Sequence, residues 1–252
     1  MVRRLIDQNR RREVRRQGLL LDRLERKFTG KLRVEIARAM REMIRVYELT
    51  GEVPAARDHT DNLTSVFQSL AVASATTFGA RVIGQGKDAG YVLETKDFAG
   101  TMARLALSYV ASEMIRRRIT SISDTTRAQI VAAVARGYAD GLGVAGIAAA
   151  IDANVGTISR SRAALIARTE THGAANFGAM NAAQETGIRL KREWLAAHDA
   201  RTRDTHAEAD GQIVGQDEPF DIGGYAMMYP GDPAGPAEET INCRCALGFV
   251  VD

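Results

Sequence analysis

Apolar residues recur every third or fourth position through most of the first 187 residues, which is the spacing of one helix face. The clearest stretch begins at Phe28 and ends at Tyr47, and arginines fill positions between the apolar ones. This pattern predicts a helix that packs one stripe of side chains and exposes the opposite face. Gly51 is the expected end of that helix.

The same spacing predicts further helices as far as Gly187. They are expected over residues 63 to about 82, 97–118, 123–141, 144–151 and 159–187, with the segment 84–90 (GQGKDAG) as a loop. Ser123 or Asp124 is the expected N-cap of one of these helices, because both residue types accept hydrogen bonds from free backbone N–H groups. Gly141 and Gly143 are expected to stop that helix.

The pattern changes after Gly187, where short β-type runs replace the helical spacing. Residues 188–199 (IRLKREWLAAHD) alternate imperfectly, GQIVG and CRCALGFVV are β-type runs, and PFDIGGYAMMYPGDPAGP reads as a loop. Proline is absent between Pro54 and Pro219 and then crowds the segment up to Pro236, which marks irregular chain.

These patterns predict an α+β fold that is mostly α. A long helical N-terminal and central body is followed by a small C-terminal α+β module with a few short strands. We expect three parts: an arginine-rich helical region over residues 1–100, a helical body over 101–187 and the terminal module over 188–252. A chain of 252 residues with 45% hydrophobic residues is long enough to bury a core.

The positive charge is concentrated at the front of the chain. Residues 1–50 carry 15 Lys/Arg against 7 Asp/Glu, so the remainder has 19 of the 34 basic and 24 of the 31 acidic residues. Basic side chains of this kind bind double-stranded DNA phosphates or an acidic partner, although a solvated helix face explains them equally well. The candidate contacts are Arg3, Arg4, Arg10, Arg11, Arg12, Arg15 and Arg16.

The first residues lack the apolar core of a secretory signal, and no stretch approaches the roughly 18 uninterrupted apolar residues of a membrane span. We therefore expect folding in a cytoplasm and no membrane partner. The chain's two cysteines, Cys243 and Cys245, stand one residue apart in the sequence NCRC. This spacing is too tight for a relaxed disulfide and suits a reducing compartment.

The two cysteines permit three interpretations. If CRC is a strand, both thiols point to one face, and with His206 and either His198 or Asp199 they complete a four-ligand Zn²⁺ set. Alternatively, they are small buried residues of a core strand. In the third interpretation, one thiol, His206 as base and Asp199 as orienting group form a nucleophilic triad.

The ordered motifs RSRAALIARTETHGAANFGAMNAAQETG, KREWLAAHDARTRDTHAEADGQIV, PF, PGDP and INCRC resemble the phage Mu protein F-like head morphogenesis family. The resemblance covers roughly Leu105 to Phe249. The positions that match the family pattern are Arg168, Thr169, Trp194, Asp199, Arg201, Thr202, Arg203, His206, Gly211, Asn242, Cys243, Arg244 and Cys245.

The resemblance implies a minor head protein of a tailed phage or prophage, with no catalytic role for the matched positions. It implies a structural part in capsid assembly, with the portal, major capsid or scaffolding protein as partners, and a role in DNA packaging or ejection. The implied location is the capsid interior or portal vertex of the virion, after assembly in the cytoplasm of the host bacterium.

Two other functional classes stay open from the residues. One is a metal- or Cys/His-dependent hydrolase or nuclease, and the other is a sequence-independent DNA-binding protein of the capsid interior. The family also occurs fused to toxin domains. Because the sequence ends shortly after NCRC, we expect no toxin activity.

Overall fold

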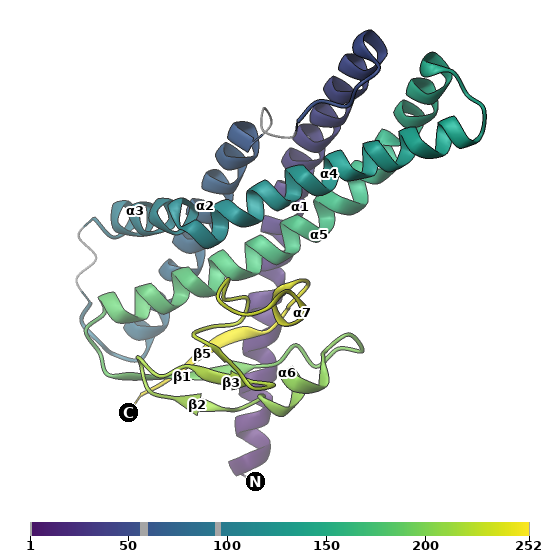
Figure 1. Ribbon diagram of the computed structural model, residues 1–252. Coiled ribbons are helices and arrows are strands. Elements are labelled where there is room, and N and C mark those ends of the chain that lie inside the picture. The colour runs from purple at the N-terminus through teal and green to yellow at the C-terminus, as the bar shows by residue number, and fades with distance from the viewer. Residues whose placement is uncertain (1, 56–59, 94–96, 252) are drawn as a thin grey trace. The chain divides into compact units, whose positions relative to one another are not determined.

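A computed structural model describes residues 2–55, 60–93 and 97–251, with side chains from Arg10 onward (Figure 1). Arg3 and Arg4 lie outside the described side chains. The elements in these ranges are α1 (Val2–Thr50), α2 (Thr60–Asp88), α3 (Phe98–Ala111), α4 (Glu113–Ala139), α5 (Val144–Glu185), β1 (Leu190–Leu195), α6 (Asp204–Glu208), β2 (Ile213–Val214), β3 (Phe220–Ile222), β4 (Tyr225–Met227), α7 (Ala237–Thr240) and β5 (Ala246–Val251). The predicted class, α+β and mostly α, is confirmed.

The chain folds into two compact units, and each is built from separated segments. The first unit comprises Met1–Glu25, Gln68–Tyr109 and Arg168–Asp252, and the second comprises Arg26–Phe67 and Val110–Ala167. Helices α1, α2, α3 and α5 each contribute residues to both units. The sequence-based division into 1–100, 101–187 and 188–252 stays a prediction.

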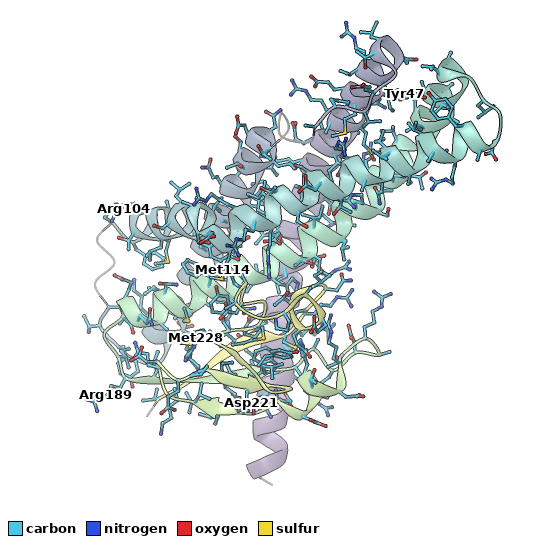
Figure 2. All side chains as sticks on the ribbon, in the orientation of Figure 1. Tyr47, Arg104, Met114, Arg189, Asp221 and Met228 are labelled. Carbon is cyan, nitrogen blue, oxygen red and sulfur yellow. The ribbon has the colours of Figure 1, made fainter. Side chains whose placement is uncertain are left out.

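The second unit is helical, and its core contains the apolar stripe that the sequence predicted. Phe28, Leu32, Met40 and Tyr47 are fully buried there, and Figure 2 marks Tyr47. Gly51, with a positive φ of 74°, follows the helix end as expected. The buried stripe therefore explains why the long helix forms over this part of the chain.

Two helix boundaries in the second unit differ from the predictions. Helix α4 begins after Ser112, whose side chain accepts a hydrogen bond from the N–H of Ile115, whereas Ser123 is buried inside the helix. Helix α5 is continuous from Val144 to Glu185, whereas the sequence predicts two helices over 144–151 and 159–187. Val155 and Ser159 are buried, so tertiary packing overrides the turn-forming residues between them.

The first unit holds all the described strands. Strand β1 is the centre of an antiparallel sheet of order β2-β1-β5, and Trp194 of β1 faces Leu247 of β5 in the register. Strands β3 and β4 form a separate hairpin inside the segment expected to be a loop. Its two connecting residues, Gly223 and Gly224, have positive φ, which favours a tight hairpin turn.

Helix α5 anchors the strands through Asn176, which is 2% exposed. Its side-chain amide donates to the backbone oxygens of Pro230 and Cys245 at 2.9 and 3.2 Å, and its oxygen accepts the N–H of Leu247 at 3.0 Å. Gln17 of α1 adds a hydrogen bond to the oxygen of Leu247. The start of β5 is therefore fixed by two helices.

Helix α2 is longer than predicted, and it contains a long apolar stretch. It continues to Asp88 through the segment expected to be a loop, and Gly90 follows it with a φ of 89°. By length and mean hydropathy (1.2) it alone among the described helices qualifies to cross a membrane, but 56% of that apolar window is buried within the protein. A core helix has the same properties, and the absence of a membrane partner stays a prediction.

Candidate metal centre

The NCRC segment is a connection between α7 and β5. Strand β5 begins only at Ala246, so the expectation that CRC is a strand is wrong. Asn242 has a φ of 60°, a conformation that asparagine tolerates at the end of a helix. Its N–H donates to Oγ1 of Thr169 at 3.1 Å, and its Oδ1 accepts from Arg168 at 3.2 Å. The asparagine therefore turns the chain and ties it to α5.

Although the segment is not a strand, both thiols face His206, as a shared metal site requires. His206 on α6, Cys243 and Cys245 are each about 2% exposed, and their candidate ligand atoms all lie within 4.8 Å of one another. Nδ1 of His206 is 3.3 Å from Sγ of Cys245 and 3.8 Å from Sγ of Cys243. The structure thus gathers three residues of metal-binding type.

The other imidazole nitrogen faces a carboxylate. Nε2 of His206 lies 2.8 Å from Oε2 of Glu239, which is buried on α7 and also accepts a hydrogen bond from Thr205. A carboxylate at this position favours a proton on Nε2, which leaves Nδ1 as the nitrogen that faces the thiols. Glu239 cannot be recognised from the sequence, because nothing in its local pattern pairs it with His206, 33 positions earlier.

The thiols and the imidazole also change one another's protonation. The hydrogen bond from Cys245 outweighs burial and holds the pKa of Cys243 well below its ordinary value, while the same pairing raises the pKa of Cys245. Burial lowers the pKa of His206, but the hydrogen bond and charge of Cys243 raise it above its ordinary value. Of the two thiols, that of Cys243 therefore ionises first.

A cavity of about 230 Å³ opens beside the three residues. Four arginines line it: Arg168, Arg201, Arg203 and Arg244. Arg203 donates to the backbone oxygen of Ile241 at 2.6 Å, which connects the start of α6 to the end of α7. The cavity is accordingly positively charged around the thiols.

Asp199 and His198, the two candidate fourth ligands, are engaged elsewhere. Asp199 also lines the cavity, but its Oδ2 pairs with Arg244 at 2.8 Å and its Oδ1 accepts the N–H of Arg201. His198 is half exposed and pairs with Asp210 at 3.2 Å. The structure therefore brings together His206, Cys243 and Cys245 but neither of these two, and it offers Glu239 rather than Asp199 as the carboxylate that orients His206.

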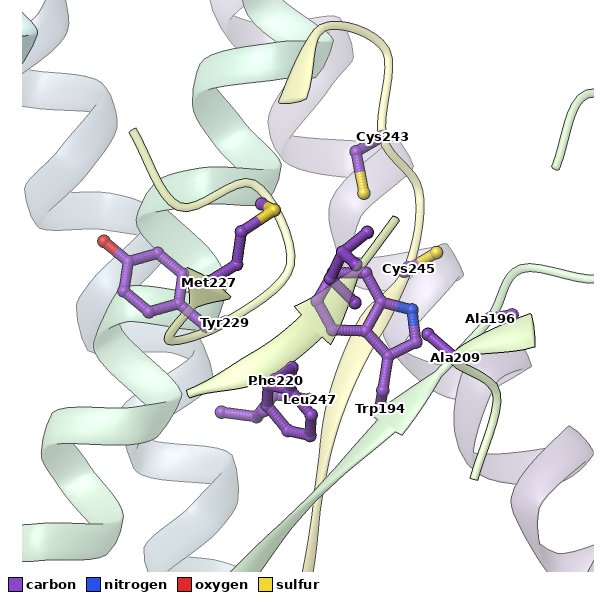
Figure 3. Packing of buried hydrophobic residues seen from close by; sticks show 10 residues of the cluster. Trp194, Ala196, Ala209, Phe220, Met227, Tyr229, Cys243, Cys245 and Leu247 are labelled. Carbon is purple, nitrogen blue, oxygen red and sulfur yellow. The ribbon is translucent and has the colours of Figure 1, made fainter. Parts of the chain in front are cut away.

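Trp194 and Gly211 support this centre from β1 and from the turn after α6. The indole of Trp194 is fully buried, and its ring centroid is 5.4 Å from those of His206 and Phe220. Figure 3 shows Trp194 and Phe220 in the same buried cluster as Cys243 and Cys245. Gly211 has a φ of 81°, and its N–H donates to the oxygen of Trp194. Thr202 donates a hydrogen bond to Asp199 at 3.3 Å. With these contacts, every position that matches the family pattern either contacts another part of this unit or lines its cavity.

Among the candidate arginines at the front of the chain, Arg10 is already paired. It contacts Glu193 at 2.8 Å and Asp210 at 3.2 Å. Arg11, Arg12, Arg15 and Arg16 are exposed. Their spacing places them on neighbouring turns of α1, where they form a basic patch.

Comparison with known proteins gives the same family that the motifs indicated. Residues 128–248 match the model of the family described as Phage Mu protein F like protein. This segment is similar to that family, and we call it the F-like domain. The F-like domain contains every residue of the centre and every matched motif position.

Three curated relatives share parts of the sequence. The chain is 34% identical over 140 residues to minor head protein GP7 of Bacillus phage SPP1, which covers 54% of this chain and 43% of that protein. It is 35% identical over 146 residues to NAD(+)–arginine ADP-ribosyltransferase EFV of Enterococcus faecalis, covering 57% of this chain and 30% of the relative.

The third relative is YqbB of Bacillus subtilis, 32% identical over 97 residues, which cover 37% of this chain and 32% of that protein. The chain thus spans less than half the length of each of these relatives. No solved structure matches the chain.

Proposed function

We propose that this chain is a structural head protein of a phage or prophage that acts in head morphogenesis and is built into the virion. The observations that carry the proposal are the similarity to minor head protein GP7 over 140 residues and the match of residues 128–248 to the family model. The virion location follows from that function.

The geometry of the F-like domain supports a structural rather than a catalytic use of its motif. Asn242 makes a turn, Asp199 and Arg244 form an ion pair, and Arg203 holds a backbone oxygen. Each of these contacts fixes the connection between α7 and β5. The motif residues therefore stabilise the connection that leads into β5.

The proposed partners are the portal protein and the major capsid or scaffolding protein, with roles in DNA packaging or ejection at the portal vertex or capsid interior. Exposed arginines of the basic patch suit an acidic protein surface or packaged double-stranded DNA. Affinity capture with this chain as bait, in cells that co-express portal, major capsid and scaffolding proteins, tests the assignment. Retention of portal protein supports it, and retention of none of the three contradicts it.

An enzyme is the alternative class. His206 between Cys243 and Glu239 has the residue types of a nucleophile, a base and an orienting carboxylate, and a cavity lies beside them. The name of the Enterococcus relative describes an ADP-ribosyltransferase, of which this chain spans 30%. We propose that the F-like domain itself has neither Cys/His-dependent hydrolase activity nor ADP-ribosyltransferase activity.

Incubation assays separate the two classes. The full chain is mixed with DNA or RNA and divalent metals, with a peptide or ester substrate, or with NAD⁺ and an arginine acceptor. A structural protein leaves all substrates unchanged. Turnover that disappears in Cys243→Ala or His206→Ala, while both variants remain folded, contradicts the proposal.

A further inference from the structure

Three residues from two separate segments converge on one point of the first unit. His206 comes from α6, and Cys243 and Cys245 come from the connection before β5. All three are buried, so their polar atoms have exchanged water for one another. Buried clusters of this composition are characteristic of bound soft metal ions.

The distances fit zinc. Tetrahedral Zn²⁺ with bonds of about 2.3 Å to sulfur and about 2.0 Å to nitrogen separates its ligand atoms by roughly 3.5 to 3.8 Å. The imidazole nitrogen is 3.3 Å from one sulfur and 3.8 Å from the other, and no pair of ligand atoms is more than 4.8 Å apart. Small side-chain rotations suffice to reach the required separations.

The orientation of the imidazole fits as well. Glu239 contacts Nε2 at 2.8 Å and is itself held by Thr205. A metal-binding histidine commonly presents its second ring nitrogen to a carboxylate, which fixes the tautomer and the ring orientation. Here that carboxylate lies on the side of the ring opposite the thiols, so Nδ1 is directed at the metal position.

We propose that His206, Cys243 and Cys245 bind one zinc ion, with the fourth coordination position open to the arginine-lined cavity. Among the described residues, the group of candidate ligands contains these three alone. A water molecule or another small ligand from the cavity therefore completes the tetrahedron. The ion joins α6 to the chain entering β5, and it stabilises the terminal part of the F-like domain.

Metal analysis of the full chain, purified without chelator from zinc-supplemented cells, tests the site. We expect about one zinc per chain, and loss of the metal in Cys243→Ser, Cys245→Ser and His206→Asn. His198→Asn is the matched control, because it removes a histidine that pairs with Asp210 outside the group. Glu239→Gln is expected to retain the site with about 10- to 100-fold weaker zinc affinity.

A second measurement does not depend on the variants folding. In the wild-type chain, Cys243 and Cys245 are the only thiols, so a thiol reagent reports on this site alone. Zinc slows the reaction of both thiols, and a chelator restores it. Protein that contains no zinc, binds none when it is added, and shows the same thiol reactivity with and without chelator overturns the proposal. A Cys243–Cys245 disulfide in freshly purified protein overturns it too.

Discussion

At the scale of single residues, a few buried polar side chains hold the terminal strands in place. Asn176 satisfies three backbone groups at once, and it lies 69 and 71 positions from two of them. Asn176 has no signal in the sequence, because hydrogen bonds across such separations leave no periodic pattern. Residue type alone identifies the cysteines and His206 as candidates. The sequence pattern predicts Asp199 as the carboxylate beside the imidazole, whereas in the structure that carboxylate is Glu239 and Asp199 pairs with Arg244.

Replacement of Asn176 by alanine is expected to cost about 2–4 kcal/mol of unfolding free energy, since it leaves buried N–H and C=O groups without partners. Chemical denaturation monitored by the fluorescence of Trp194 measures the loss. Asn154→Ala is the matched control on α5, because that side chain is exposed and bonds only its own helix. An equal effect of both substitutions contradicts the role of Asn176.

The Glu25 carboxylate makes the first unit sensitive to acid. Burial raises its pKa, but the hydrogen bond and charge of His172, together with Arg168, lower it below the ordinary value of 4.5. The unfolded chain therefore takes up this proton more readily than the folded chain, and the stabilisation is present above pH 4.5 and lost as the pH falls through the folded pKa.

Glu25→Gln is therefore expected to be less stable than wild type at neutral pH and to lose less stability in acid. Denaturation midpoints from pH 7 down to about pH 3 measure this difference. The control is Asp22→Asn, which changes an exposed carboxylate of the same helix. Parallel pH profiles for wild type and Glu25→Gln would show that the contact with His172 is unimportant.

At the scale of elements, the sequence predicted helices where an apolar stripe is long and failed where packing decides. The helix over Phe28–Tyr47 follows its buried face, and Gly141 ends α4 as expected, with a φ of 75°. The α5 helix continues through a segment of turn-forming residues because its buried neighbours require it. The β3–β4 hairpin did have a local signal, the Gly223–Gly224 pair between short apolar runs, which indicates a two-residue hairpin turn.

Helices α2 and α5 approach closely in the first unit at Gly178. A Cβ atom there would lie 2.3 Å from Cα of Ala75, so Gly178→Ala must separate the two helices. We expect a loss of about 1–3 kcal/mol. Gly156→Ala, at an exposed position of the same helix with open space around it, should instead stabilise by about 0.5–1 kcal/mol. Thermal unfolding of both variants checks the opposite signs.

At the scale of the whole molecule, we propose that the basic patch on α1 contacts DNA or an acidic partner protein. If it contacts DNA, the logarithm of affinity falls linearly with that of salt, by about 0.9 for each phosphate neutralised. Changing Arg11, Arg12, Arg15 and Arg16 to glutamine should weaken binding and flatten this dependence. Glutamine at Arg33, Arg38, Arg41 and Arg45, exposed arginines of the same helix, is the charge-matched control. Equal effects of the two sets would assign DNA binding to net charge rather than to the patch.

A structural head protein must be present in the assembled phage particle. Quantitative mass spectrometry of purified, nuclease-treated heads from the phage or induced prophage that encodes this chain measures its presence and copy number directly. The account predicts that the chain co-purifies with portal and major capsid protein in a fixed ratio, and that heads formed after its deletion are fewer or defective. Heads that lack the chain and assemble normally without it would contradict a structural role in head morphogenesis.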